Sequence, residues 1–500
     1  MLHQKSLLRT SALLVLLAMA AAAASSCGEA GSGTETSAVD TAVQTEAETE
    51  DPNSRANIKD SLPDDLDFTG RTFSIFCSHG TTNDLYLGGP AEQTGEVVDD
   101  AVLARNKAVE ERLGVTLRSD TIEYGWDTVA AGVSKLIMAG DTTYDLFFGQ
   151  QAGITKLVTD NCFVNAFDLK YLDFTQPWWN NEYMDALSLG KDYRFFLISD
   201  YDISTLDNLR VVYYNKAMYA RYYDDGDGLY QEVFDGKWTL DRMAELAKSV
   251  FIDLDNNGKS EMTDQLGYVT YATGSSVDAF VYATDISFTE RDADGFITLN
   301  LMQDRAVTLL EKLNTIFWQE GSCHQTDGKN TDCFIAGTAL FLGNATLGTA
   351  KNLRDMKEDF GFLPYPKLDE AQEGYHSLVH DTVLVPGFSN ASQNLDIAGA
   401  VLEALSAETY RSVTPVWYET ALKVKYSRDM ASTQMIDLIH DSMTTNFAFA
   451  YNYSLNNAGL MFRELVGAKS TNYASKCKSV EKSAVKQLAK LVEAFTGANE

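Results

Sequence analysis

The chain has 500 residues, a formal net charge of −31 at pH 7 and 45% hydrophobic residues. Because such an acidic surface repels phosphate backbones and anionic lipid headgroups, we expect no nucleic-acid partner. The length allows two or three domains after removal of an N-terminal signal, and the hydrophobic content is sufficient for a large core.

The first 27 residues have the layout of a bacterial lipoprotein signal. Lys5 and Arg9 precede an apolar run at 11–20, and small residues at 24–26 lead to Cys27. This resembles a lipobox, whose cysteine receives a diacylglyceryl group and becomes the new N-terminus. Ala24 stands where the usual lipobox has Leu, so a plain secretory signal is the alternative. We predict a signal peptide at 1–27 and lipidation at Cys27, which places the protein on the outer face of the bacterial cell membrane.

The next segment, 28–60, is predicted to be a disordered acidic tether. It consists largely of Gly, Ser, Thr, Ala, Glu and Asp and has almost no large apolar residue. Such a segment cannot bury enough surface to offset the entropy lost on ordering. Nothing else in the chain reaches the roughly 18 apolar residues of a membrane helix, so the lipid is the only expected membrane contact.

After the tether, strand and helix patterns alternate. The stretch 71–76 alternates like a strand, 97–113 has helical spacing, and 115–117 resumes as strand. A helix at 128–139 and a strand at 144–148 follow. Parallel strands joined by helical crossovers produce this order, so we predict a layered α/β sheet whose ligands lie beyond the carboxyl ends of the strands.

A second α/β set occupies the rest of the chain. Its apolar faces again have helical or strand spacing, and the C-terminal helix carries lysines on its outer positions. The predicted strands are 208–214, 267–270 and 338–342, and the predicted helices are 240–250, 304–317, 394–407 and 480–495.

Five segments together resemble the extracellular solute-binding proteins of ABC importers, family 1. They occur in the family's order and span most of the chain after the tether. In the fourth segment, 236–241, Thr239 is placed to cap the helix that begins there. The segments are 100–115, 176–180 with 193–196, 211–216, 236–241 and 359–367.

This resemblance implies a periplasmic-binding-protein-like type II fold, in which two α/β lobes are joined by hinge strands. Lobe 1 would comprise 61–202 and 384–440, and lobe 2 would comprise 203–383 and 441–500. The chain would cross between lobes near 199–204, near 377–386 and around Asp441. Closure of the lobes would trap a ligand, and the importer would recognise the closed shape.

The function implied is that of a monomeric, lipid-anchored receptor that hands a small solute, an oligosaccharide, to an ABC-importer permease. A sensor lipoprotein would share the same binding chemistry. The alternative class is a secreted, lipid-anchored glycoside hydrolase, because carboxylate pairs arise by chance among 71 acidic residues.

Candidate ligand-binding residues combine aromatic faces for stacking on sugars with amides and carboxylates for hydroxyl groups. Each has a structural alternative: core packing for the tryptophans, and a surface or turn role for the polar residues. The predicted set comprises Gln150, Gln151, Trp178, Trp179, Asp200, Asp202, Asn344, Thr346 and Trp417.

The segment 253–264 has the spacing of an EF-hand-type loop, with Gly258 at the sharp turn. Hard Ca²⁺ needs several oxygen ligands that converge on one point, so we predict a structural calcium site. A metal-free turn is the alternative. The predicted ligands are Asp253, Asp255, Asn257, Lys259 through its carbonyl, Glu261 and Asp264.

Sequence signatures of catalysis are missing. There is no GxSxG, no HExxH and no phosphate loop, so we expect neither enzymatic activity nor a redox or nucleotide cofactor. Cys323 and Cys333 flank a short polar loop and either pair or stay as thiols.

Overall fold

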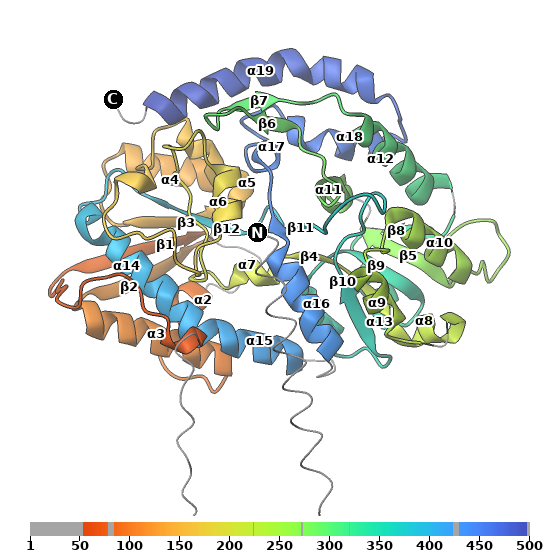
Figure 1. Cartoon of the computed structure of the whole chain (residues 1–500), viewed down its shortest axis with the longest axis horizontal. Helices are drawn as coiled ribbons and strands as arrows, with labels where there is room; N and C mark the ends of the chain where they lie inside the picture. Colours follow the sequence, from red (N-terminus) through yellow and green to blue (C-terminus); the bar gives the residue numbers. More distant parts are fainter. Residues whose placement is uncertain are drawn as a thin grey trace, which may run out of the picture. The chain divides into compact units, whose positions relative to one another are not determined.

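The computed structural model describes residues 54–78, 85–223, 225–271, 274–319, 321–423 and 430–497. The predicted signal peptide, Cys27 and the tether up to residue 53 lie outside these residues. Two separate β-sheets, both within the unit Pro52–Glu500, organise the described chain (Figure 1). We call the parts built around them the first and the second lobe.

The first sheet has the strand order β12-β3-β1-β2. β1 pairs in parallel with both β2 and β3, and β12 pairs antiparallel with β3. Helices α3 (Val97–Leu113) and α4 (Val129–Met138) are the crossovers between the parallel strands. The strands are β1 (Thr72–Ser78), β2 (Thr116–Ile122), β3 (Leu146–Gln150) and β12 (Leu384–Phe388).

The second sheet has the order β10-β4-β9-β5-β8. β5 is parallel to β8 and β9, whereas β4 is antiparallel to both of its neighbours. The start of β4 therefore shares an edge with the carboxyl ends of β5 and β9. The strands are β4 (Arg210–Asn215), β5 (Leu266–Tyr271), β8 (Cys323–Thr326), β9 (Ala339–Thr346) and β10 (Phe360–Leu363); a hairpin of β6 (Thr289–Arg291) and β7 (Ile297–Leu299) stands apart.

Amphipathic helices cover both sheets. In α10, Thr239 is the N-cap that its sequence position predicted, because its hydroxyl accepts a hydrogen bond from the Arg242 amide. The other helices are α2 (Leu85–Gly88), α5 (Gln151–Ile154), α6 (Asn181–Leu187), α7 (Ser204–Asp207), α8 (Lys216–Tyr223), α9 (Gly228–Phe234), α10 (Leu240–Val250), α11 (Asp278–Tyr282), α12 (Asp304–Asn314), α13 (Asn330–Ile335), α14 (Leu395–Glu408), α15 (Thr414–Lys423), α16 (Met430–Asp441), α17 (Phe447–Ala450), α18 (Met461–Gly467) and α19 (Tyr473–Gly497).

Three stretches of chain connect the lobes and contact one another. β11 (Ser377–Leu378) pairs in parallel with β13 (Met443–Thr444), and Val379 bridges to Leu209 at the start of the second sheet. The chain then continues directly into β12 of the first sheet. These stretches lie close to the three predicted crossings, while the exact lobe boundaries stay a prediction.

The C-terminal helix α19 contacts both lobes. Near its start the Tyr473 hydroxyl donates to the Leu301 carbonyl of the second lobe, and near its end Phe495 packs edge-on against Phe195 of the first. Figure 1 shows this helix passing above the hairpin β6–β7. It is longer than the predicted helix at 480–495.

Two expectations from the sequence were wrong. Residues 54–60 were assigned to the disordered tether, but Asp60 forms ion pairs with Arg112 and Arg411, and the Arg55 guanidinium lies 4.2 Å from the Tyr410 ring centre. The interactions with these partners offset the entropy lost when the segment becomes ordered, which could not be seen from composition alone. The residues 343–346, expected to follow a strand, belong to β9 itself.

All five cysteines in the described residues are free and buried, so Cys323 and Cys333 do not pair. Among the described helices, none is both long and apolar enough to span a membrane.

Candidate functional site

Gln150 and Gln151 lie where the first sheet faces the lobe connection. Both side chains are buried, with Gln150 at the end of β3 and Gln151 opening α5. The Gln151 amide N–H donates to the Val383 carbonyl, and its side-chain oxygen accepts from the Tyr183 hydroxyl at 2.7 Å. Among the described residues, the side-chain nitrogen of Gln151 has no hydrogen-bond partner.

Next to this edge, an ion network joins the second lobe to the connecting segment. Arg463 of α18 donates from Nε to both carboxylate oxygens of Asp278 at 3.0 Å, and from Nη2 to Asp381 at 3.3 Å. Asp278 is 3% exposed. Its burial raises its pKa to about 6 although Arg463 acts in the opposite direction.

An aromatic pair completes this region. Trp126, which follows β2, stacks on Tyr453 with ring centres 5.7 Å apart and planes 9° from parallel. The charges of Asp381 and Arg463 both act on the Tyr453 hydroxyl, whose pKa is raised chiefly by burial. Trp126 is 46% exposed, so much of its indole is available to another molecule. We define the interlobe cluster as Trp126, Gln151, Asp278, Asp381, Tyr453 and Arg463.

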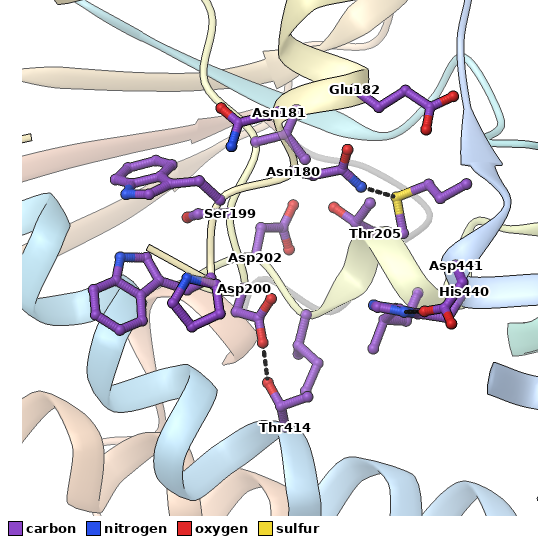
Figure 2. Close-up of a pocket in the computed structure, with 17 residues that line it drawn as sticks. Asn180, Asn181, Glu182, Ser199, Asp200, Asp202, Thr205, Thr414, His440 and Asp441 are labelled. Carbon is purple, nitrogen blue, oxygen red and sulfur yellow. Dashed lines mark hydrogen bonds and ion pairs between the residues drawn. The ribbon is translucent and has the colours of Figure 1, made fainter. Parts of the chain in front are cut away.

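Four predicted ligand residues meet in a different place. Trp178, Trp179, Asp200 and Asp202 line a pocket of about 260 Å³ beside the connecting segments. Figure 2 shows α6 on one side of this pocket and His440 and Asp441 on another. We call it the hinge pocket; its other lining residues are Pro177, Asn180, Asn181, Glu182, Ile198, Ser199, Ile203, Thr205, Leu206, Thr414, His440, Asp441 and Met443.

The two tryptophans are fixed by one buried carboxyl group. The indole N–H of Trp178 donates to Oε1 of Glu403 at 3.0 Å, and that of Trp179 donates to Oε2 at 3.1 Å. Glu403 lies on α14 with no exposed surface. Burial raises its pKa to about 7, although the indole donors and the Asp173 amide favour the ionised form.

The remaining predicted ligand residues lie elsewhere. Asn344 accepts a hydrogen bond from Arg210 at 2.8 Å. Thr346 caps the 3₁₀ helix that follows β9. Trp417 is buried and lines a small cavity of about 60 Å³. The nine predicted residues therefore do not form one site.

The predicted calcium loop has the expected turn. The carboxylate oxygens of Asp253, Asp255 and Asp264 lie within 4.8 Å of one another. The Gly258 amide donates to Asp253 at 2.7 Å and is the main cause of the lowered pKa of that carboxyl. The other predicted ligands bond within the loop: the Asn257 side chain donates to Asp255 and Glu261, and the Lys259 amide donates to Asn257.

Five members of the interlobe cluster were missed by sequence reasoning: Trp126, Asp278, Asp381, Tyr453 and Arg463. For Trp126 a signal existed, because it follows the second predicted strand at the same sheet edge as Gln150. No local pattern marks Asp278 and Arg463, which lie 185 residues apart in the sequence and meet only through the fold.

Two α/β lobes joined by paired hinge segments define the class of two-lobed solute-binding folds, as predicted. No protein-family model matches the chain, and no curated protein sequence matches it either. The comparison with known proteins therefore rests on solved structures that have a similar fold.

The maltose/maltodextrin-binding domain MalE from Bdellovibrio bacteriovorus bound to maltotriose is 15% identical, with 84% of this chain and 100% of that chain covered and a TM-score of 0.52. An ABC transporter solute-binding protein from Thermotoga lettingae bound with α-D-tagatose is 14% identical, with 84% and 100% covered and a TM-score of 0.52. The galacto-N-biose/lacto-N-biose I-binding protein of a Bifidobacterium longum ABC transporter, in complex with lacto-N-biose, is 11% identical, with 84% and 97% covered and a TM-score of 0.54. At these identities the likeness establishes the fold.

Proposed function

We propose that the chain is the extracytoplasmic solute-binding receptor of an ABC importer and that its solute is a carbohydrate. The observation that carries the proposal is the fold, shared over 84% of this chain with proteins that hold maltotriose, tagatose and lacto-N-biose. The receptor would act as a monomer that delivers its solute to a membrane permease.

The interlobe cluster supports a carbohydrate solute through its chemistry. The exposed indole of Trp126 offers a flat apolar face for the C–H side of a sugar ring. Asp381, which is partly exposed, offers an acceptor for hydroxyl groups, and the side-chain nitrogen of Gln151, which has no partner among the described residues, is a donor. Because the members come from both lobes and the connection between them, a ligand held there would favour one lobe arrangement.

A glycoside hydrolase is the less supported alternative. The two carboxylates of the interlobe cluster, Asp278 and Asp381, are both bound to Arg463, so neither stands free as a general acid or nucleophile. Incubating the protein with a panel of oligosaccharides distinguishes the two functions. A receptor raises its melting temperature with one of them and leaves it chemically unchanged; release of reducing ends would favour the hydrolase.

Lipid anchoring at Cys27 is the second part of the proposal. Its support is the sequence pattern of residues 5–27. Cys27→Ala is expected to release the protein from the membrane fraction into the medium, as measured by immunoblot of both fractions. If the variant stays membrane-bound, the lipid anchor is wrong while the receptor proposal survives.

Calcium in the loop at 253–264 is the third part. The three converging carboxylates support it, and its role would be structural, because the loop joins α10 to β5 at the rim of the second sheet.

A further inference from the structure

The hinge pocket is lined by more acidic than basic side chains. Four carboxyl groups line it, from Glu182, Asp200, Asp202 and Asp441, and no lysine or arginine of the described residues does. Within the part of the chain that the structure describes, His440 is the only basic lining residue, and its Nδ1 lies 3.0 Å from Asp441 Oδ1. Arg55, 3.9 Å from Asp200, spreads its guanidinium over the Tyr410 ring.

Two buried side chains in this pocket each have a polar atom without a hydrogen-bond partner among the described residues. Asp202 is 6% exposed; its Oδ1 accepts from the Ser204 amide and hydroxyl, whereas Oδ2 has no hydrogen-bond partner among the described residues. The Thr205 hydroxyl, also buried, is likewise unpartnered within the described chain. Figure 2 shows both side chains in the middle of the group that lines the pocket. Buried groups of this kind normally have partners, so a bound water or ligand is expected beside each of these two atoms.

The neighbouring Asp200 is a second carboxyl group that lines this pocket. Its Oδ2 accepts from the Thr414 hydroxyl at 2.8 Å. Burial raises the pKa of both Asp200 and Asp202, the latter to about 6. A cation brought into the pocket would therefore stabilise the ionised form of each carboxyl group.

The walls favour an organic cation over a metal ion. Apolar surface comes from Pro177, Ile198, Ile203, Leu206 and Met443, which suits an aliphatic chain. A hard metal ion needs converging oxygens. Among the described residues, the only such convergence of acidic, histidine or cysteine ligands is in the loop at 253–264.

We infer that the hinge pocket is a second binding site, which takes a small aliphatic ammonium compound through Asp200, Asp202 and Thr205. The ammonium group donates to Asp202 Oδ2 and the Thr205 hydroxyl, and the aliphatic part lies against the apolar wall. The volume of about 260 Å³ lies just below the roughly 300–1,000 Å³ typical of small-molecule sites, which suits a small ligand. This site is separate from the proposed carbohydrate site, and the inference does not depend on the proposed function.

The test is calorimetric titration of the purified protein with 1,4-diaminobutane, using 1,4-butanediol as an uncharged match of the same length. We expect saturable 1:1 binding of the diamine and none of the diol. Asp202→Asn, which keeps the bond to Ser204, should weaken binding by at least about tenfold. Thr205→Val, which keeps the shape, should weaken it by about threefold or more. Asp168→Asn, which removes the same charge from an exposed site outside the pocket, should leave it unchanged.

Several results would overturn the inference. They are no saturable diamine binding, equal binding of the diol, or undiminished binding in folded Asp202→Asn and Thr205→Val. Loss of diamine binding in Trp126→Ala with retention in Asp202→Asn would place the diamine site at the interlobe cluster. That result would also contradict the inference. Failure to bind any sugar would count against the proposed function alone.

Discussion

Glu403 is a carboxyl group that helix α14 holds inside the protein as a hydrogen-bond acceptor for two adjacent tryptophans. The sequence predicted the helix and its apolar face. It also left open whether Trp178 and Trp179 bind a ligand or pack in the core, because a single indole serves both purposes. Their common partner, more than 220 residues away, becomes visible only in the fold, and it ties the indole nitrogens to the protein interior.

The raised pKa of Glu403 predicts a pH dependence of stability. The folded-state pKa of about 7 lies above the ordinary 4.5. Glu403 therefore contributes about 3 kcal/mol to the free energy of unfolding. This contribution is fully present below about pH 4.5 and is lost as the pH rises through about 7. Glu403→Gln removes the titration, so the difference in unfolding free energy between wild type and variant should change across this range in denaturant titrations. Parallel curves between pH 4.5 and 7.5 would contradict the assignment.

Arg105 is the second residue whose role the sequence did not indicate. An arginine within the apolar stripe of a helix such as α3 can lay its stem along the edge of the buried face, but the Arg105 guanidinium is wholly buried. It donates to the carbonyls of Leu87 and Tyr201 and to the Thr409 hydroxyl, and it lies 4.6 Å from the Tyr201 ring centre. An arginine in a helical stripe can snorkel or be buried, and only its partners decide which.

Arg105→Lys is therefore expected to be destabilising although the charge is retained. A lysine lacks the planar fork that reaches three acceptors, and buried carbonyls lose their donors. We expect a loss of about 2–4 kcal/mol in unfolding free energy by denaturant titration. Lys107→Arg, at an exposed position of the same helix, should change it by less than about 0.5 kcal/mol. Equal stability of the two variants would contradict the structural role.

Among the elements, helices were the easiest to predict from sequence. The apolar spacing of α3 and α10 defined both at the observed bounds, Val97–Leu113 and Leu240–Val250, because the buried stripe repeats every three to four residues. β9 was predicted too short, since Gly343 and Asn344 resemble turn residues. The strand continues through them to Thr346 because the pairing with β4 resumes after an irregularity in register.

The loop between α10 and β5 is the element that the calcium proposal concerns. With calcium present the melting temperature should exceed that in chelator by about 3 °C or more, because the ion binds the folded loop alone. Asp253→Ala should abolish this difference in thermal-shift measurements.

Asp292→Ala is the matched control for that loop. Asp292 accepts backbone amides in the turn of the β6–β7 hairpin and belongs to no group of converging carboxylates in the described chain. This variant should keep the calcium response. A wild-type melting curve that is the same in calcium and in chelator would rule the site out.

For the molecule as a whole, alternation of strands and helices and the five family-like segments were enough to predict two α/β lobes. The pairing of β12 with β3 and of β11 with β13 joins segments far apart in sequence, and no local pattern specifies such partners. The same limit applies to the site: Gln151 was predicted from its strand end, whereas Tyr453 and Arg463 come from the C-terminal segment.

The central claim is that a carbohydrate binds at the interlobe cluster, and titration calorimetry tests it most directly. The titrant is the oligosaccharide that gives the largest thermal shift, and the samples are wild type, Trp126→Ala and the control Tyr222→Ala, which removes an exposed aromatic ring from α8. We predict 1:1 binding to wild type and the control, and at least about tenfold weaker binding to Trp126→Ala. Binding of equal strength to all three proteins, or no carbohydrate bound by wild type, would contradict the claim.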